Sequence, residues 1–274
     1  MPAAVTGSEE PGRDTFASSR SHQRGLEENP PVASPFVPKV ALFVTCIVDQ
    51  LFPDIGVSSV RLLEAAGVDV EFPEAQTCCG QPAMGAGEPD AARRLARHHL
   101  DVFGAYDAVV APSGSCSAMA AHWYPELLAE RAVDVASLAG RTFELSQYLA
   151  DELGRTDLGA TVTASVTVHD ACHGLRHAHV GDASRRLLTA AGASIVEMDE
   201  SETCCGFGGA FGERFPELAG ALADEKLRHA ARADVDYLVS GDAACLAHLE
   251  GRRRRTGSGP RPVHFAELLA AGLP

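Results

Sequence analysis

The chain has 274 residues, of which 46% are hydrophobic, and its formal net charge at pH 7 is −14. This length allows two ordinary domains, or one domain built from two similar halves. The negative charge disfavours nucleic acid as a partner, because phosphate binding needs clustered Lys and Arg. No stretch of the sequence approaches the roughly 20 apolar residues that a membrane-spanning helix needs.

Residues 1–38 are rich in Ser, Pro, Glu, Gly and Arg and show no hydrophobic period. Because this composition cannot build a core, we expect a disordered leader. It also lacks the apolar centre of a secretory signal, so we expect a cytoplasmic protein without a transmembrane segment. The cytoplasm keeps thiols reduced, and the eight cysteines are therefore expected to be ligands or catalysts rather than disulfides.

Order is expected to begin at Lys39, where the apolar run from Val40 to Val44 predicts a strand buried on both faces. The elements expected next are a helix over 57–66, a strand over 68–72, a helix over 89–103 and a strand over 108–111. Strands that alternate with helices in this way are typical of a parallel sheet.

The same pattern restarts in the second half of the chain. Its expected elements are a strand over 162–168, a strand over 194–198, a helix over 216–231 and a strand over 237–240. Six of the seven residues in Arg186–Gly192 match Arg61–Gly67, which indicates an internal duplication. We therefore predict an α/β fold with two pseudo-repeated parallel-sheet βαβ units, at 39–160 and 161–274. The segment 126–159 is expected to be mostly helical.

The eight cysteines divide into two sets of four with matched spacing. The first cysteine set is Cys46, Cys78, Cys79 and Cys116, and the second cysteine set is Cys172, Cys204, Cys205 and Cys245. In both sets, 31 residues separate the first cysteine from the adjacent pair, and a glycine follows the pair. The cysteines come after predicted strands. Because ligand sites form at the carboxyl ends of parallel strands, each set should converge there.

Four thiolates can hold one zinc ion or one four-iron cluster. The adjacent pair favours the cluster, because neighbouring side chains diverge and a cluster offers a separate iron to each sulfur. We therefore predict that all eight cysteines are ligands of two [4Fe–4S] clusters. The glycine after each pair is expected where a backbone needs a positive φ or has no room for a Cβ. The alternatives are a zinc-stabilised scaffold without a redox role and a thiol–disulfide catalyst.

Other polar residues lie near the predicted ligands. His169 and His173 flank Cys172 and are candidates to tune a cluster through hydrogen bonds, although a polar loop after a strand is the simpler reading. Asp170 and Asp242 are candidates to replace a thiolate. The sequence shows no flavin or nicotinamide motif, so no catalytic residue is assigned.

The two Cys-Cys-Gly elements at matched spacing resemble the cysteine-rich CCG-domain family over about residues 39–250. This family includes a heterodisulfide reductase subunit and the iron–sulfur subunits of glycolate and glycerol-3-phosphate oxidation, and the chain is most similar to its lactate-utilisation members. The resemblance implies an iron–sulfur electron-transfer subunit of a cytoplasmic oxidoreductase complex that oxidises L-lactate to pyruvate. It also implies two partner proteins, one of them carrying ferredoxin-like clusters. Another 2-hydroxy acid, such as glycolate, is the alternative substrate.

The chain departs from the family's pattern at one point. The family's motif ends in Cys-x-x-Cys, whereas Ser113 and Asp242 stand here in place of the earlier cysteine. Four thiolates remain in each repeat, which favours one conventional cluster per repeat over the five-cysteine noncubane cluster that the heterodisulfide reductase members imply. The step that removes electrons from the substrate is then expected partly or wholly in a partner, with this chain as the relay.

Overall fold

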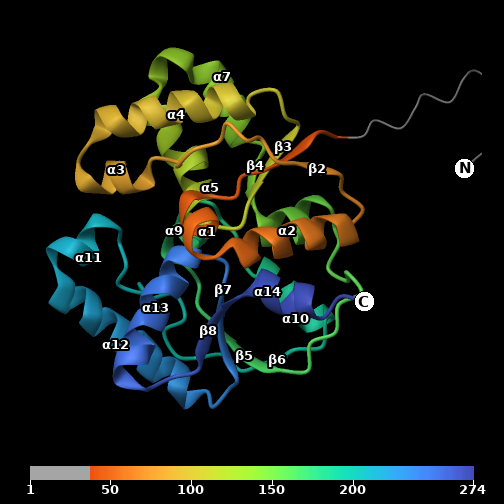
Figure 1. Ribbon diagram of the computed structural model, residues 1–274, viewed down its shortest axis with the longest axis vertical. Helices are drawn as coiled ribbons and strands as arrows, with labels where there is room; N and C mark the ends of the chain where they lie inside the picture. Colours follow the sequence, from red (N-terminus) through yellow and green to blue (C-terminus); the bar gives the residue numbers. More distant parts are fainter. Residues whose placement is uncertain (1–37) are drawn as a thin grey trace, which may run out of the picture. The chain divides into compact units, whose positions relative to one another are not determined.

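The structure is a computed structural model that describes residues 38–274 (Figure 1). Residues 1–37, which carry nearly all of the predicted leader, lie outside the described residues. The described chain contains two four-stranded sheets with all neighbouring strands parallel, and helices are interleaved between the strands. The predicted α/β class with two pseudo-repeated units is therefore confirmed.

The first sheet has the strand order β2-β1-β3-β4. Its strands are β1 (Val40–Leu42), β2 (Val70–Glu71), β3 (Ala108–Ala111) and β4 (Thr142–Glu144). The central strands β1 and β3 are buried along their whole length, as expected of apolar runs in a sheet that is covered on both faces.

Helices and short helical turns connect these strands. They are α1 (Cys46–Leu51), α2 (Pro53–Ala65), α3 (Gln81–Ala86), α4 (Pro89–Phe103), α5 (Gly114–Ala118), α6 (Tyr124–Leu127), α7 (Ala132–Ala139) and α8 (Leu145–Gln147), with a 3₁₀ turn η2 (Ala129–Arg131) and two π-helical turns, η1 (Met119–Trp123) and η3 (Tyr148–Glu152). Proline at the first turn of α2, α4 and α6 costs no hydrogen bond, because those N–H groups have no partner within a helix.

The second sheet repeats the arrangement, with the order β6-β5-β7-β8. Its elements are β5 (Ser165–Val168), α9 (Cys172–Arg176), α10 (Ala183–Ala190), β6 (Ser194–Ile195), α11 (Ala210–Arg214), α12 (Pro216–Arg232), β7 (Tyr237–Ser240), α13 (Ala243–Thr256), β8 (Arg261–His264) and α14 (Phe265–Ala271). Individual backbone hydrogen bonds are also equivalent in the two repeats. The Phe43 amide donates to Val110 O at 2.8 Å, and the His169 amide donates to Val239 O at the same distance.

Each sheet has a fourth strand that the sequence pattern did not predict. The segment 126–159 was expected to be mostly helical, yet β4 lies within it, and β8 lies near the end of the second repeat. Both strands are short and begin or end on polar residues, so neither forms an apolar run. β4 is a strand because it pairs with β3, and β8 because it pairs with β7. Such pairing is a tertiary contact that the local sequence does not show.

One apolar core joins the two repeats within the unit formed by residues 38–274. Leu62 and Leu63 of α2 lie in the same buried cluster as Leu269 and Ala270 of α14, because α14 packs against α2 (Figure 1). The boundary between 160 and 161 stays a prediction. Among the described helices, none has the length and apolar character required to cross a bilayer.

Candidate metal centre

The first cysteine set gathers at the carboxyl ends of the strands of the first sheet. Cys46 begins α1 just after β1, the adjacent pair follows β2, and Cys116 lies in α5 after β3. The Sγ atoms of Cys46 and Cys78 are 3.5 Å apart, as are those of Cys79 and Cys116. All four are free thiols. The expected convergence is therefore present in the first repeat.

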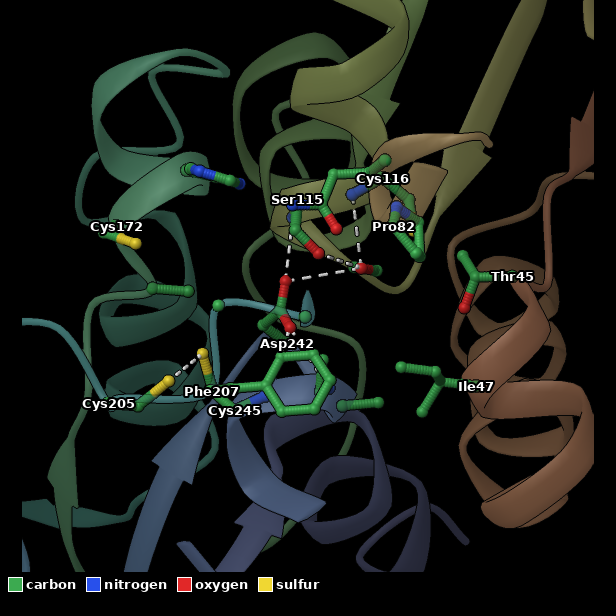
Figure 2. Close-up of a pocket in the computed structure, with 18 of the residues that line it drawn as sticks. Thr45, Ile47, Pro82, Ser115, Cys116, Cys172, Cys205, Phe207, Asp242 and Cys245 are labelled. Atoms are coloured by element: carbon green, nitrogen blue, oxygen red, sulfur yellow. Dashed lines mark hydrogen bonds between the residues drawn. The ribbon is translucent and has the colours of Figure 1, made fainter. Parts of the chain in front are cut away.

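The second cysteine set gathers in the same way. Cys205 Sγ and Cys245 Sγ are 2.9 Å apart, and Cys172 and Cys204 lie with them along the wall of one cavity. A cavity of about 170 Å³ is lined by residues of both sets, and Figure 2 shows Cys116 and Cys172 at its wall. The two sets thus face a common space, while the role of the eight cysteines as ligands stays a prediction.

Each set favours a thiolate before any metal binds. The Cys46 thiol donates to Cys78 and lowers the pKa of Cys78 to about 3, and the Cys172 thiol lowers the pKa of Cys204 to about 2 in the same way. The amide of the following glycine also donates to each of these sulfurs, at 3.4 Å in the first repeat and 3.3 Å in the second. Because metals bind the thiolate, this prepares each set for a soft metal.

The glycine after each adjacent pair is required by the backbone. Gly80 has φ 89° and Gly206 has φ 90°, which L side chains rarely adopt. A Cβ on Gly206 would lie 2.4 Å from Ala219 O, and one on Gly80 would lie 3.3 Å from Ala92 O. Both reasons expected from the sequence, a positive φ and a lack of room, are confirmed.

The two candidate carboxylates have other partners than a metal. Asp242 Oδ1 accepts hydrogen bonds from the amides of Ala244 and Cys245, at 3.1 and 3.4 Å, and so caps α13. Asp242 Oδ2 accepts from the Ser115 amide at 2.8 Å (Figure 2) and from Ser113 Oγ at 3.3 Å. The other carboxylate, Asp170, lies two residues after the end of β5 and is bonded to the guanidinium of Arg185 at 2.7 Å. The structure therefore does not support either as a substitute for a thiolate.

Asp242 also belongs to the contact that joins the two cysteine sets. Asp242, in the second repeat, forms an isolated antiparallel β-bridge with Ser113 of the first repeat. Beside this bridge, α5 and α9 cross at two glycines, because a Cβ on Gly114 would lie 2.9 Å from the Cα of Gly174. The helices that carry Cys116 and Cys172 approach closely for this reason.

The two candidate histidines lie where the sequence placed them, beside the second cysteine set. His169 is 1% exposed, and a ring nitrogen lies within 4.8 Å of the Sγ atoms of Cys205 and Cys245. Burial lowers its pKa to about 4, so the imidazole is neutral at pH 7. His173 lines the cavity and packs against Trp123 in a tilted arrangement, with ring centroids 5.2 Å apart. Their tuning role stays a prediction.

Sequence reasoning missed two buried residues of types that are normally charged at pH 7. Lys226, on α12, is 1% exposed, and Glu144, at the end of β4, is also 1% exposed. Lys226 could have been found as a charge on the apolar face of a predicted helix, since Ala223 and Leu227 beside it are buried as well. Glu144 gave no such signal, because its strand was not predicted.

Fold and site together define a duplicated α/β protein that gathers two sets of four free thiols, a donor set suited to soft metals or iron–sulfur clusters. The family model described as CCG, cysteine-rich domain, matches residues 40–120 and 166–250, and the chain belongs to this family.

Relatives with a curated name extend this match over most of the chain. It is 41% identical over 238 residues to Lactate utilization protein A of Oceanobacillus iheyensis, which covers 84% of this chain and 96% of the relative. It is 40% identical over 237 residues to the protein of the same name from Geobacillus kaustophilus, covering 85% of this chain and 99% of the relative.

Solved structures are less similar. Glutamate racemase RacE1 from Bacillus anthracis aligns with a TM-score of 0.36 at 11% identity, covering 85% of this chain and 79% of the racemase. A glutamate racemase from Francisella tularensis aligns with a TM-score of 0.34 at 12% identity, covering 86% and 78%. Likeness at this level carries no argument about the function of the chain.

Proposed function

We propose that the chain is the iron–sulfur electron-transfer subunit of a cytoplasmic oxidoreductase complex that oxidises L-lactate to pyruvate. The observation that carries the proposal is the convergence of four free thiols at matching strand ends in each repeat, within a family of cysteine-rich domains. The substrate rests on the name of the relatives, Lactate utilization protein A.

The residues present fit one [4Fe–4S] cluster in each set. The first set supplies Cys46, Cys78, Cys79 and Cys116, and the second supplies Cys172, Cys204, Cys205 and Cys245. The adjacent pairs suit a cluster with a separate iron for each sulfur, and the depressed pKa of one thiol per set supplies a thiolate at neutral pH. When bound, such a cluster takes up and releases single electrons.

The chain's own residues hold the two sets toward each other and keep their surroundings apolar. Asp242 fixes the backbone next to Cys116 and Cys245, and Ile47 and Phe207 line the cavity that both sets share (Figure 2). The described residues that line this cavity include no Lys or Arg. A lactate carboxylate would find no ion-pair partner there, which supports a relay role, with substrate oxidation in a partner subunit that carries further iron–sulfur clusters.

The proposal is tested by the iron, acid-labile sulfide and zinc contents of protein purified without oxygen, together with its optical and EPR spectra. We expect about eight irons and as many sulfides per chain, counting one four-iron cluster per set. Cys79→Ser and Cys205→Ser should each leave about half of the iron. Retention of all the iron in either variant would contradict the ligand assignment.

The same measurement decides the alternative of a zinc-stabilised scaffold. One observation favours it, since His169, Cys205 and Cys245 place three possible ligand atoms within 4.8 Å of one another. Stoichiometric zinc without iron would establish a structural site and end the redox proposal. If iron is present, reduction of the chain by L-lactate in the presence of its partner proteins tests the substrate, with glycolate as the comparison.

A further inference from the structure

The two cysteine sets have different neighbours at equivalent positions. The first pair of equivalent residues consists of the residue directly after β1 and the residue directly after β5. Phe43 and His169 occupy the same place, because their amides donate to Val110 O and Val239 O at 2.8 Å in both cases. An apolar ring in the first repeat is thus replaced by an imidazole in the second.

The second pair lies on the helices that cover the adjacent cysteines, α4 and α12. A Cβ on Gly80 would meet Ala92, and a Cβ on Gly206 would meet Ala219, so these two alanines are equivalent. Seven residues further along each helix lie His99 and Lys226, respectively. A histidine in the first repeat is therefore replaced by a lysine in the second.

The first cysteine set has an uncharged, aromatic environment on this side. The ring of His99 lies 4.7 Å from Phe43, 4.4 Å from Phe103 and 5.3 Å from Tyr124, measured between centroids. Burial lowers the pKa of His99 to about 3, so its ring is neutral. The hydroxyl of Tyr124 donates to Cys79 O at 2.9 Å, which ties this aromatic group to the adjacent pair.

The second cysteine set instead has a buried cation. Lys226 Nζ donates to the carbonyl oxygens of Glu200 and Ser201, the latter at 3.0 Å. The Ser201 carbonyl oxygen also lies 3.3 Å from the His169 ring, a nitrogen of which lies within 4.8 Å of the Sγ atoms of Cys205 and Cys245, so the ammonium group lies on the side of the second cysteine set. Because the ammonium group is removed from water, its field is weakly screened.

We propose that Lys226 makes the cluster held by the second cysteine set easier to reduce than the cluster held by the first, so that the second is reduced before the first. This inference rests on the proposed function, since it requires one cluster per set. Reduction adds one negative charge to a cluster, and a buried cation near the sulfurs stabilises the reduced form.

The other charges near the second set do not cancel this difference. Asp170 is bound by Arg185, whose guanidinium lies 2.7 Å from the carboxylate and also pairs with Glu197, whose half-exposed carboxylate is screened by water. Asp242 opposes the effect, but three amides and one hydroxyl donate to its carboxylate and offset part of its charge. Lys226 has no carboxylate partner among the described residues, so its charge remains available to the cluster.

The test is an EPR-monitored redox titration of the full chain, purified without oxygen. We expect two reduction steps. Lys226→Met should shift the equilibrium of the step at higher potential at least tenfold toward the oxidised form, which is a shift of about 59 mV for one electron, and should leave the other step unchanged. Lys226→His, which installs the first repeat's residue, should shift the same step in the same direction.

A matched control lies on the same helix. Arg228 is half exposed and paired with Glu225, so Arg228→Met should leave both steps in place. Cys79→Ser, which removes a ligand of the first set, should leave only the step at higher potential and so assigns it to the second.

Several results would overturn the inference. These are a shift of the lower step, an unchanged higher step in Lys226→Met, or loss of the higher step in Cys79→Ser. If Lys226→Met loses the second cluster, Lys226→His is measured in the same titration, and an unchanged higher step in that variant would overturn the inference. Protein that contains no iron would instead refute the proposed function, so the two failures are distinguishable.

Discussion

Replacing Asp242 with Ser separates the two hydrogen-bonding roles of this residue. The first repeat has a serine, Ser113, at the equivalent position, and its Oγ accepts from the Cys116 amide as a helix cap. Asp242→Ser should therefore keep the cap of α13. The shorter side chain has only one oxygen, so the hydrogen bond from the Ser115 amide in the other repeat is lost.

The structure sets the size of the effect. Asp242 is 1% exposed, and the Ser115 amide donates to it at 2.8 Å. A buried N–H group left without a partner costs about 1–3 kcal/mol. In a chain of this size each kcal/mol lowers the midpoint of thermal unfolding by about 2–4 °C, so the expected drop is roughly 2–12 °C.

The assay is thermal unfolding of protein purified without oxygen, followed by circular dichroism. Asp199→Ser is a matched control, because Asp199 is exposed and the same change there should alter stability by less than about 0.5 kcal/mol. If Asp242→Ser unfolds at the same temperature as the parent protein, the hydrogen bond across the repeats contributes nothing and the reasoning is refuted.

Two further substitutions test the packing and the buried charges. Gly114→Ala should cost about 1–3 kcal/mol in thermal unfolding, because its Cβ would lie 2.9 Å from Gly174 Cα, whereas Gly85→Ala enters open space and should not destabilise; equal losses would contradict this. Burial raises the pKa of Glu144 to about 7, so the folded state should lose up to about 3 kcal/mol as the pH rises from about 4 to 7. Glu144→Gln should abolish that loss in denaturation at pH 5 and pH 8, and an unchanged pH dependence would contradict the assignment.

Local sequence patterns predicted the elements that are buried by their own apolar runs. The strands 108–111 and 237–240 have the predicted bounds, and the helix 89–103 does as well. The strand β4 was missed, because Thr142–Glu144 is a strand only through its pairing with β3. The other outer strands were predicted too long for the same reason, since their length depends on how far a neighbour extends.

The part of the candidate site that depends on spacing along the chain could be predicted from the sequence. The two cysteine sets and the glycine after each pair follow from matched distances along the chain. The position of Lys226 beside the second set does not follow from the spacing, because it depends on how α12 packs against the loop that contains Ser201. The link from Asp242 to Ser115 is likewise a contact between repeats, which no local pattern encodes.

The packing of α14 against α2 has a consequence for how the protein is made. Of the described helices, α14 is synthesised last, yet its residues Leu269 and Ala270 close the core around Leu62 and Leu63. A nascent chain therefore carries an exposed apolar face on α2 throughout translation of the second repeat. Domains usually fold in order from the N-terminus, but here the first repeat completes its core only after the second has been made. Native packing of the first repeat thus depends on residues that are made after the whole second cysteine set.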